Sequence, residues 1–493
     1  MNTCLVRLGS RRTLVPCRSI PLLVLSLALA ATATTGAQLV TPKTVPLHQD
    51  EQFAIFPSAY AGMAGVSIAL DDTLADPFAN PALATRVRRG AVFVTPYVHG
   101  VSAGHGGGNT LPFGAAGAAG SWAGTMVVAL QQINQPATTI GGIPQPASNQ
   151  YGSFVLARRL EHGISVGASA YVAGLNAMDD LDLLYAGSDR LTQSGTLRDY
   201  RLGFTKDWGE RRFDAVLVTN RTNVSQNVHY TFYTRDSVNE TTRITQFAED
   251  NVDETTIWGA HTQYVQPVGD GWRVGWLATA NRLSHPKIPD YRIQNIPRDP
   301  GNTTAFNIGA GASHREGADL VAIDVIMEPM YSRTWGTAAN DTAVASGGVL
   351  HAGERTVDNR FTFSNVHLRF GASHDFAVSR DSATAWTIQY GLGAYVIKYR
   401  LRQDDHVQQT NRIDDRAWTE WTPSIGLSHR TRAFTVRYNY HRTCGPSACI
   451  DIGTGDRVTV PASGGIIAAP AEGRWIEGAT VHVHQLMITV PIR

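Results

Sequence analysis

From residue 151 onward the chain repeats one unit, in which two strands with alternating apolar and polar residues are joined by a short polar turn. Residues 159–163, 207–211, 267–271, 314–317 and 430–432 are such turns, and residues 374–381 form a longer one. The connectors between units are longer and polar: residues 176–195, 225–251, 285–302, 332–359, 403–416 and 443–476. Connectors of this length are uncommon inside a compact domain. Short turns on one side and long loops on the other are typical of a transmembrane antiparallel β-barrel.

The alternation within each strand predicts which residues face outward. In residues 434–441, for example, Phe434, Val436, Tyr438 and Tyr440 share one face, and polar residues lie between them. A soluble β-sandwich would also alternate, but it would not explain the sidedness of the connectors. The charged residues expected on the inner face are Arg201, Asp214, Arg273, Asp324, Glu328, His367, Arg369 and Arg437. We expect them to line a solvated lumen and to pair with groups inside it, and a substrate path is the alternative.

The strand count follows from parity. Thirteen strands are expected from residue 151 onward, ending with residues 479–492, and two periplasmic termini require an even total. Residues 90–101, 113–121 and 125–133 supply three more, with a turn at residues 122–124, which gives sixteen. If the Ala- and Gly-rich residues 113–120 are not part of the wall, the count falls towards fourteen. The prediction is therefore an all-β barrel of about 14–16 strands.

Residues 1–37 have the features of a secretory signal peptide. Four arginines precede an apolar run at residues 20–33, and small residues follow at positions 35–37. The sequence around Arg11 and Arg12 is similar to a twin-arginine signal, but that route carries folded proteins, so the general secretory route is favoured. Beyond residue 37 no apolar run is long enough for a membrane helix. We therefore expect an outer-membrane location in a Gram-negative-type cell.

The charge balance and the remaining motifs exclude several functions. With 42 basic and 41 acidic residues, nothing favours a nucleic-acid partner. Residues 163–167 match the G-x-S-x-G pattern of serine hydrolases, but they lie early in a strand and not at a strand-to-helix turn, so an enzyme is not expected. No cofactor is predicted.

Cys444 and Cys449 share one expected external loop, and a disulfide between them is the favoured interpretation. A metal site with His441, His482 and His484 is the alternative. It is disfavoured because His441 shares the inner phase of its strand, whereas His482 and His484 share the outer phase of theirs.

Residues 38–89 lack sustained period-two alternation. Asp76-Pro77 and Asn80-Pro81 place a capping residue before a proline, which predicts very short helices. Such a segment neither spans a membrane nor folds alone, so we expect it to form a hatch inside the barrel. The expected domains are the signal peptide at residues 1–37, the hatch at residues 38–89 and the barrel at residues 90–493.

A family resemblance adds to this interpretation. A glycine-rich stretch at residues 62–70, the acidic pair Asp71 and Asp72, the turn Asn80-Pro81-Ala82 and the strand at residues 90–94 follow one another. This order resembles the opening of the FadL-type long-chain fatty acid transporter family. Two departures are Leu83, where the family often has glycine, and the absence of the terminal aromatic residue that the barrel-assembly machinery usually recognises.

The resemblance implies a hatch-plugged barrel that passes hydrophobic or amphipathic molecules through its lumen, with membrane lipid and the barrel-assembly machinery as further partners. We expect the solute to be held by apolar hatch residues, namely Phe53, Ile55, Phe56, Met63 and Phe78. PorV-type barrels of a secretion apparatus open in a similar way. The alternative function is therefore a non-transporting barrel that acts as a scaffold or receptor for secreted proteins.

Overall fold

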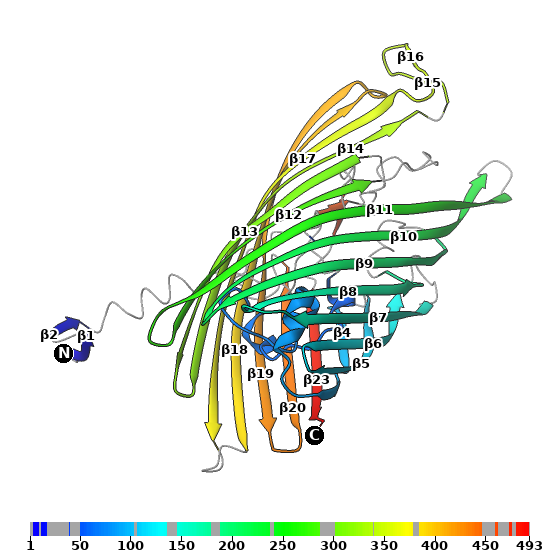
Figure 1. Ribbon diagram of the computed structural model, residues 1–493. Helices are drawn as coiled ribbons and strands as arrows, with labels where there is room; N and C mark the ends of the chain where they lie inside the picture. The colour runs from blue at the N-terminus through cyan, green and yellow to red at the C-terminus, as the bar shows by residue number, and fades with distance from the viewer. Residues whose placement is uncertain are drawn as a thin grey trace.

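A computed structural model shows the chain as a closed antiparallel β-barrel (Figure 1). The residues that it describes are 50–102, 106–135, 145–178, 188–236, 241–285, 301–338, 340–377, 384–445 and 480–492, together with the short pieces 3–8, 11–16, 39, 459–461 and 473–475. None of the helices in these ranges is long and apolar enough to cross a membrane.

The wall is built from strands that pair with their neighbours in sequence. Its strands are β3 (Ala91–Val94), β4 (Tyr97–Val101), β5 (Gly107–Ala119), β6 (Trp122–Gln135), β7 (Gln145–Arg159), β8 (Ile164–Leu175), β9 (Arg190–Trp208), β10 (Arg211–Asp236), β11 (Thr241–Gly269), β12 (Trp272–His285), β13 (Gly301–Glu316), β14 (Asp319–Thr337), β17 (Arg355–Ala377), β18 (Ala385–Asp405), β19 (Thr410–Arg430), β20 (Thr435–Cys444) and β23 (Thr480–Pro491). Because β3 and β4 share one place between β23 and β5, the wall has sixteen strand positions.

Three small hairpins lie outside the wall order. They are β1 (Thr3–Leu8) with β2 (Arg11–Pro16), β15 (Thr342–Ala343) with β16 (Val349–Leu350), and β21 (Thr459–Pro461) with β22 (Gly473–Trp475). The rest of the expected signal peptide, including its apolar run, lies outside the described residues.

The structure confirms the predicted barrel, at the upper end of the predicted strand count. The predicted turn at residues 122–124 is wrong, because Trp122 already pairs with Ala119. The turn lies at Gly120 and Ser121 instead, where Gly120 adopts a φ of 60° that favours glycine.

Two of the predicted long loops are also wrong. Residues 225–251 and 403–416 are mainly strand: β10 and β11 stay paired out to Asp236 and Thr241, and β18 and β19 out to Asp405 and Thr410. Backbone pairing needs no apolar side chains, so the ladders continue beyond the apolar part of the wall. The other four long connectors do separate strands, although much of residues 176–195, 285–302 and 443–476 lies outside the described part of the chain.

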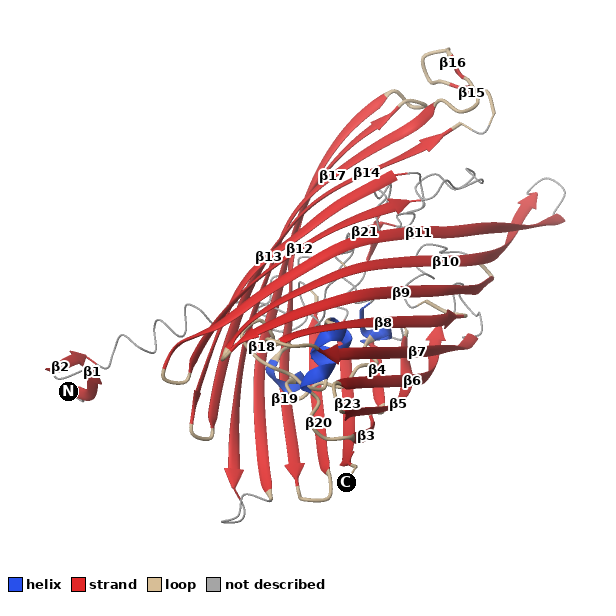
Figure 2. Ribbon diagram, in the orientation of Figure 1, coloured by secondary structure: helices blue, strands red, loops and turns tan. Residues whose placement is uncertain are grey.

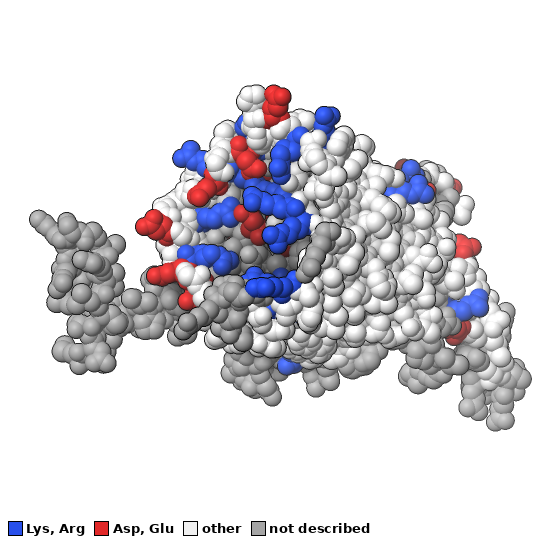
Figure 3. Space-filling model, turned by 60° about the horizontal axis from the view of Figure 1, so that its bottom comes forward, with Lys and Arg blue, Asp and Glu red and all other residues white. Residues whose placement is uncertain are grey.

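The outer face of the wall carries an apolar band. In β18 the outward residues from Trp386 to Val396 are apolar, over eleven residues of strand. A transmembrane strand needs about 9–11 residues, so the band matches the thickness of a membrane. Figure 3, which looks onto the short-turn end, shows charged side chains gathered at that end and a wall beside it that is mostly uncharged.

Tryptophans mark the short-turn edge of this band. Each of them lies against a basic or histidine side chain next to a short turn: Trp122 with Arg158, Trp208 with Lys206, Trp272 with His314, and Trp386 with His429. Aromatic residues at this level are typical of transmembrane barrels.

Residues 50–86, which we call the inner segment, lie inside the ring of strands (Figure 2). They contain the short helices η1 (Asp50–Phe53), η2 (Ala61–Met63), α2 (Asp76–Ala79) and η3 (Pro81–Arg86). The side chain of Asn80 accepts a hydrogen bond from the Ala82 N–H, and Pro81 starts η3, as the sequence predicted for this turn. The inner segment then leads directly into β3.

Candidate functional site

Side chains from one arc of the wall, between β11 and β19, hold the backbone of the inner segment. Gln389 donates to the Ala59 carbonyl at 2.9 Å, Ser424 to the Gly62 carbonyl at 3.0 Å, and Arg369 to the Gly65 carbonyl at 3.0 Å. Further along the same arc, Gln263 donates to the Ile68 carbonyl at 2.8 Å and Ser313 to the Ala69 carbonyl at 2.8 Å. We call the bonds that residues 59–71 make with the wall the polar anchor.

Glycines in the wall let the inner segment approach this closely. A Cβ atom at Gly391 of β18 would overlap the backbone nitrogen of Ala64. A Cβ at Gly371 of β17 would lie 2.5 Å from the Cβ of Met63, which is shorter than van der Waals contact allows. At these two positions the wall strand therefore requires glycine for the segment to fit.

Asp71 is the charged centre of the polar anchor. Its carboxylate contacts three guanidinium groups: Arg86 of η3 at 3.0 Å, Arg273 of β12 at 2.7 Å, and Arg212 of β10. Burial raises the pKa of Asp71, but the three arginines outweigh burial and lower the pKa to about 2. The carboxylate therefore stays ionised and ties the inner segment to two wall strands.

The other residues of the predicted motif act within the segment or against β8 and β9. Asp72 accepts hydrogen bonds from the Ser58 hydroxyl and the Ala59 N–H, both at 2.7 Å. The Asn80 amide donates to the Phe204 carbonyl at 3.1 Å. Pro81 and Ala82 are buried against wall glycines of the same two strands. The motif residues thus shape the segment and dock it against the wall.

Four of the five predicted ligand residues lie together. Phe56 stacks on Phe78 with ring centroids 4.5 Å apart, and Ile55 is buried in the same cluster. Phe53 packs there too, edge-on to Tyr151 of β7 at 6.2 Å. We call this group of Phe53, Ile55, Phe56 and Phe78, with the wall side chains Tyr151 and Tyr171, the apolar contact.

Met63 does not join the apolar contact. It is fully buried in a different cluster with Val66, Leu70 and the wall residues Leu320 and Ala322. The five residues therefore do not form one surface, because η2 carries Met63 to the opposite side of the lumen, against β17, β18 and β19.

The eight predicted lumen residues all lie on the inner phase of their strands, and four of them contact the inner segment. Arg201 donates to the Phe78 and Ala79 carbonyls, and Asp324 accepts from the Ser67 N–H at 2.7 Å. Arg369 and Arg273 belong to the polar anchor.

Three of these residues interact within the wall instead. Glu328 accepts from the Tyr395 hydroxyl and contacts His367, both at 2.8 Å, and Asp214 pairs with Arg212 at 2.6 Å. Arg437 lies on the inner phase of β20, opposite the buried Met487.

Several anchoring residues were missed from the sequence. All of them lie on the lumen side of their strands, as the alternation of apolar and polar residues indicates: Arg212, Gln263, Ser313, Gln389 and Ser424. What the sequence did not supply is the pairing of each side chain with a carbonyl of a distant segment. Glycines two positions away, such as Gly391 beside Gln389 and Gly426 beside Ser424, were the available signal.

A second apolar surface lines the lumen nearer the long loops. Phe361 and Phe363 of β17, Tyr399 of β18 and Trp418 of β19 are buried there, with Met330 of β14. The Phe363 and Tyr399 rings are 5.4 Å apart, and Tyr399 meets Trp418 edge-on at 6.1 Å. Apolar residues on the inner phase depart from the polar lumen that a transmembrane barrel usually has.

One wall strand is interrupted beside the inner segment. The sequence predicted a single strand at residues 90–101, but β3 ends at Val94 and β4 begins at Tyr97. Pro96 has no N–H to donate to the ladder, and the Thr95 N–H instead donates to the Pro112 carbonyl. Tyr97 and Val101 of β4 pack with Ala54 of the inner segment.

The expected cysteine and histidine positions are partly described. Cys444 is disulfide-bonded, while Cys449 lies outside the described residues, so their pairing stays a prediction. As predicted, His441 takes the inner phase, opposite Ser424, and His482 and His484 take the outer phase beside Tyr440 and Tyr438.

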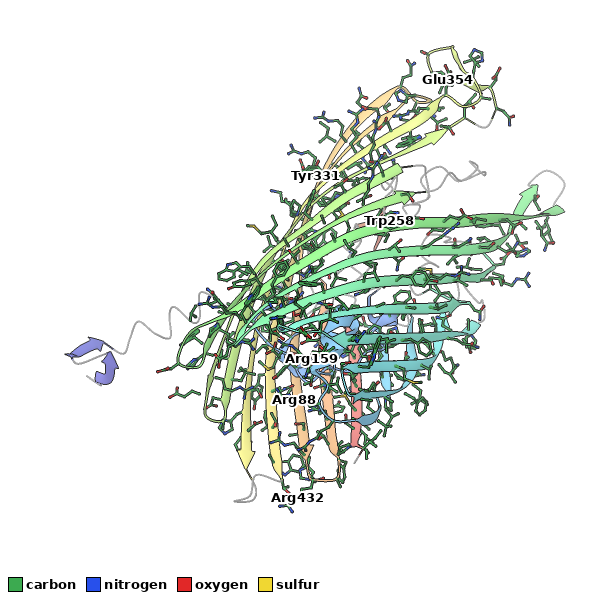
Figure 4. All side chains as sticks on the ribbon, viewed as in Figure 1. Arg88, Arg159, Trp258, Tyr331, Glu354 and Arg432 are labelled. Carbon is green, nitrogen blue, oxygen red and sulfur yellow. The ribbon has the colours of Figure 1, made fainter. Side chains whose placement is uncertain are left out.

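Ser165, the serine of the G-x-S-x-G pattern, lies within β8 and accepts a hydrogen bond from Thr85. Figure 4 shows Arg159 at the same end of the barrel, where it donates to the Thr85 carbonyl.

No protein-family model matches the sequence, and no curated protein does either. Solved structures similar to this chain include a Pseudomonas aeruginosa FadL homologue, with 12% identity and a TM-score of 0.41 over 89% of this chain and 100% of that one. The CymD monoaromatic hydrocarbon channel has 12% identity and a TM-score of 0.40 over 89% and 98%. The Pseudomonas putida toluene transporter TodX has 12% identity and a TM-score of 0.37 over 88% and 98%.

Proposed function

We propose that this protein is an outer-membrane channel that passes hydrophobic or amphipathic small molecules, such as long-chain fatty acids, through a barrel plugged by the inner segment. The solute enters from the long loops and is held at the apolar contact. It leaves when the inner segment or the interrupted wall strand yields. Diffusion down a concentration gradient drives the passage, without a bound nucleotide or metal.

The observation that carries this proposal is the apolar contact itself. Phe53, Ile55, Phe56 and Phe78 pack against wall tyrosines inside the lumen, whereas the backbone of residues 59–69 is held by hydrogen bonds from the wall. Apolar packing has no directional requirement, so an apolar solute could replace one side of this contact at little cost in free energy. A plug held in the barrel only by hydrogen bonds would offer no binding site for an apolar solute.

Two further features support a route for the solute into and out of the apolar contact. The aromatic surface around Phe361 and Tyr399 lies on β17 and β18 towards their long-loop ends, where an entering solute would first meet the lumen. The gap at Thr95 and Pro96 leaves a weaker ladder in the wall beside Ala54. The outer apolar band and the predicted signal peptide support the location in the outer membrane.

Uptake is the direct test. A deletion strain should accumulate a labelled long-chain fatty acid more slowly than its parent, and the full chain should restore the rate. Replacing Phe56→Asp should not restore it, because a carboxylate would be buried beside Phe78. The matched control is Leu160→Asp, which places the same carboxylate in an exposed short turn.

Native mass spectrometry of the purified protein provides a second readout, in which a bound lipid or detergent-like ligand is expected. Unchanged uptake in the deletion strain together with no bound ligand would overturn the proposal. Capture of a specific secreted protein in a pull-down, with no effect on uptake, would instead favour the scaffold or receptor function of PorV-type barrels.

A further inference from the structure

Basic side chains gather on the outer face of β14, β17 and β18, directly beyond the apolar band. The band ends in one row of the sheet with Met327, Val366 and Val396, which lie side by side on the outer phase. The next outward residues towards the long loops include Lys398 and Arg400 of β18 and, one step further, Arg402. Figure 4 labels Tyr331 of β14, which lies in the same row of the sheet as Thr362 of β17 and Arg400 of β18.

Three arginines occupy a single row across these strands. Arg333 of β14 is directly opposite Arg360 of β17, and Arg360 is directly opposite Arg402 of β18. Neighbouring strands are about 4.8 Å apart, so the three side chains start within about 10 Å of one another. Like charges directly opposite each other destabilise a sheet. This row therefore costs stability unless anions offset it.

The protein supplies only part of that compensation. Asp358 pairs with Arg333 and Arg355, and it lies 3.6 Å from Arg360. The Arg400 guanidinium is 2.7 Å from Asp415, and Arg360 is 3.9 Å from Asp404. In the described part of the chain, no carboxylate lies within ion-pair distance of Arg402.

We define the basic patch by its six cations, which face three carboxylates: Arg333, Arg355, Arg360, Lys398, Arg400 and Arg402 against Asp358, Asp404 and Asp415.

The basic patch is exposed, and some of its side chains are held in place before any ligand binds. The Arg360 side chain is 52% exposed and that of Arg400 is 63% exposed. Arg333 and Arg355 lie over the Trp335 ring, at 5.9 Å and 4.7 Å from its centroid. Stacking of this kind holds the two guanidinium groups in place, and only their N–H groups that do not bind Asp358 are left to donate outward.

We propose that the basic patch binds the phosphorylated headgroup of a glycolipid in the outer leaflet of the membrane. A planar guanidinium donates two parallel hydrogen bonds to a phosphate, and in this row Arg360 and Arg402 can do so, whereas Arg333 already donates two hydrogen bonds to Asp358. The patch borders the apolar band, so the acyl chains of the same molecule would cover Met327, Val366 and Val396. This continuity favours a lipid over free phosphate. The inference rests on the proposed membrane location, but it does not depend on transport.

The test uses the full chain purified in detergent and titrated with diphosphorylated lipid A and with its dephosphorylated form, with binding read by native mass spectrometry. The unmodified protein should bind the phosphorylated form at least about tenfold more tightly, as expected for one or more charge-assisted hydrogen bonds. The double variant Arg360→Gln/Arg402→Gln should lose this preference.

The matched control is Arg158→Gln. Arg158 also faces outward over a tryptophan, Trp122, but at the short-turn edge of the band. It should bind the phosphorylated lipid like the unmodified protein. Heat-modifiable migration on a gel verifies that each variant is a folded barrel. If the double variant does not fold, Lys398→Gln/Arg402→Gln replaces it, because neither Lys398 nor Arg402 forms an ion pair with a carboxylate in the described part of the chain.

Equal affinity of the unmodified protein for the two lipid forms would overturn the inference. So would full competition by inorganic phosphate at the concentration of the lipid, since this would show that the site takes free phosphate. Loss of lipid binding in Arg158→Gln to the same extent would also contradict it. A barrel that binds the phosphorylated lipid but transports no fatty acid would leave the inference standing and overturn only the proposed function.

Discussion

The two ways in which the inner segment meets the wall differ in kind. The polar anchor fixes residues 59–71 with directed bonds, each of which leaves a buried polar group unpaired if it breaks, at a cost of about 1–3 kcal/mol. The side chains of the apolar contact, Phe53, Ile55, Phe56 and Phe78, are instead held by the exclusion of water. The first allows one geometry, and the second accepts any apolar surface of suitable shape. One segment thus combines a fixed part with an exchangeable part.

The largest effect is expected from Asp71→Asn. This change leaves Arg86, Arg212 and Arg273 without their shared anion, although Arg212 keeps Asp214 and Arg86 keeps Asp207. We expect the free energy of unfolding, measured by urea titration of the barrel, to fall by about 2–3 kcal/mol, at the low end for a broken buried ion pair because Asp71 is about one third exposed. Asp270→Asn, in an exposed short turn, should have no measurable effect. Equal stability of the two variants would show that the polar anchor does not hold the segment.

A second variant removes the close approach without removing any polar group. In Gly391→Ala the new Cβ would overlap the backbone of Ala64, and overpacking of this kind costs about 2 kcal/mol. The inner segment should become accessible to trypsin while the wall stays intact. Gly174→Ala, whose Cβ would meet no atom within 4 Å, is the control. Protection of the segment in Gly391→Ala would contradict the fit described for η2.

Acid should weaken the polar anchor before it affects the apolar contact. The pKa of Asp71 is about 2 in the folded protein, below its ordinary value of 3.8, so its contribution to stability is complete above pH 4 and is lost as the pH falls towards 2. Because the side chain is about one third exposed, we expect a loss of about 1–2 kcal/mol. Unfolding titrations from pH 5 to pH 2 measure it. Asp71→Asn should lack this part of the pH dependence, and an identical profile in both proteins would refute the assignment.

The smallest effect on stability, with a clear effect on binding, is expected from Phe56→Ala. Phe56 is only half-buried, and losing its stacking on Phe78 should cost about 1 kcal/mol. Affinity for a fluorescent fatty acid should fall about tenfold, which corresponds to about 1.4 kcal/mol. Phe113→Ala, on the outer face of β5, should leave the affinity unchanged. A stability loss as large as that of Asp71→Asn would remove the distinction between the two parts.

The alternation of apolar and polar residues predicted most of the wall correctly. It placed His482 and His484 outside and Glu328, His367 and Arg369 inside, because side chains on a strand alternate strictly between its faces. It failed where the signal was not an alternation: at Pro96, which interrupts a strand, and in residues 225–251, where polar residues continue a ladder beyond the apolar band. A polar loop and a polar strand look alike in sequence when neither face of the strand packs against lipid or an apolar core.

The candidate site shows the same division. The sequence identified Asp71, Asn80 and the phenylalanines as residues of a segment within the barrel, from composition and local capping patterns. It did not separate Met63 from Phe56, or pair Asp71 with Arg212, which is 141 positions away. Nor could it place Arg333, Arg360 and Arg402 in one row, because the register between strands depends on where each turn closes.

The sequence by itself determined the class of fold, the face on which each wall residue lies and the existence of a separate segment before the wall, because these depend on local periodicity and turn chemistry. The tertiary structure decided how many strands close the ring, which carbonyl each lumen side chain meets, and which charges become neighbours. Those properties are set by the closure of a wall of sixteen strands around one segment, and no local stretch of the chain contains that information.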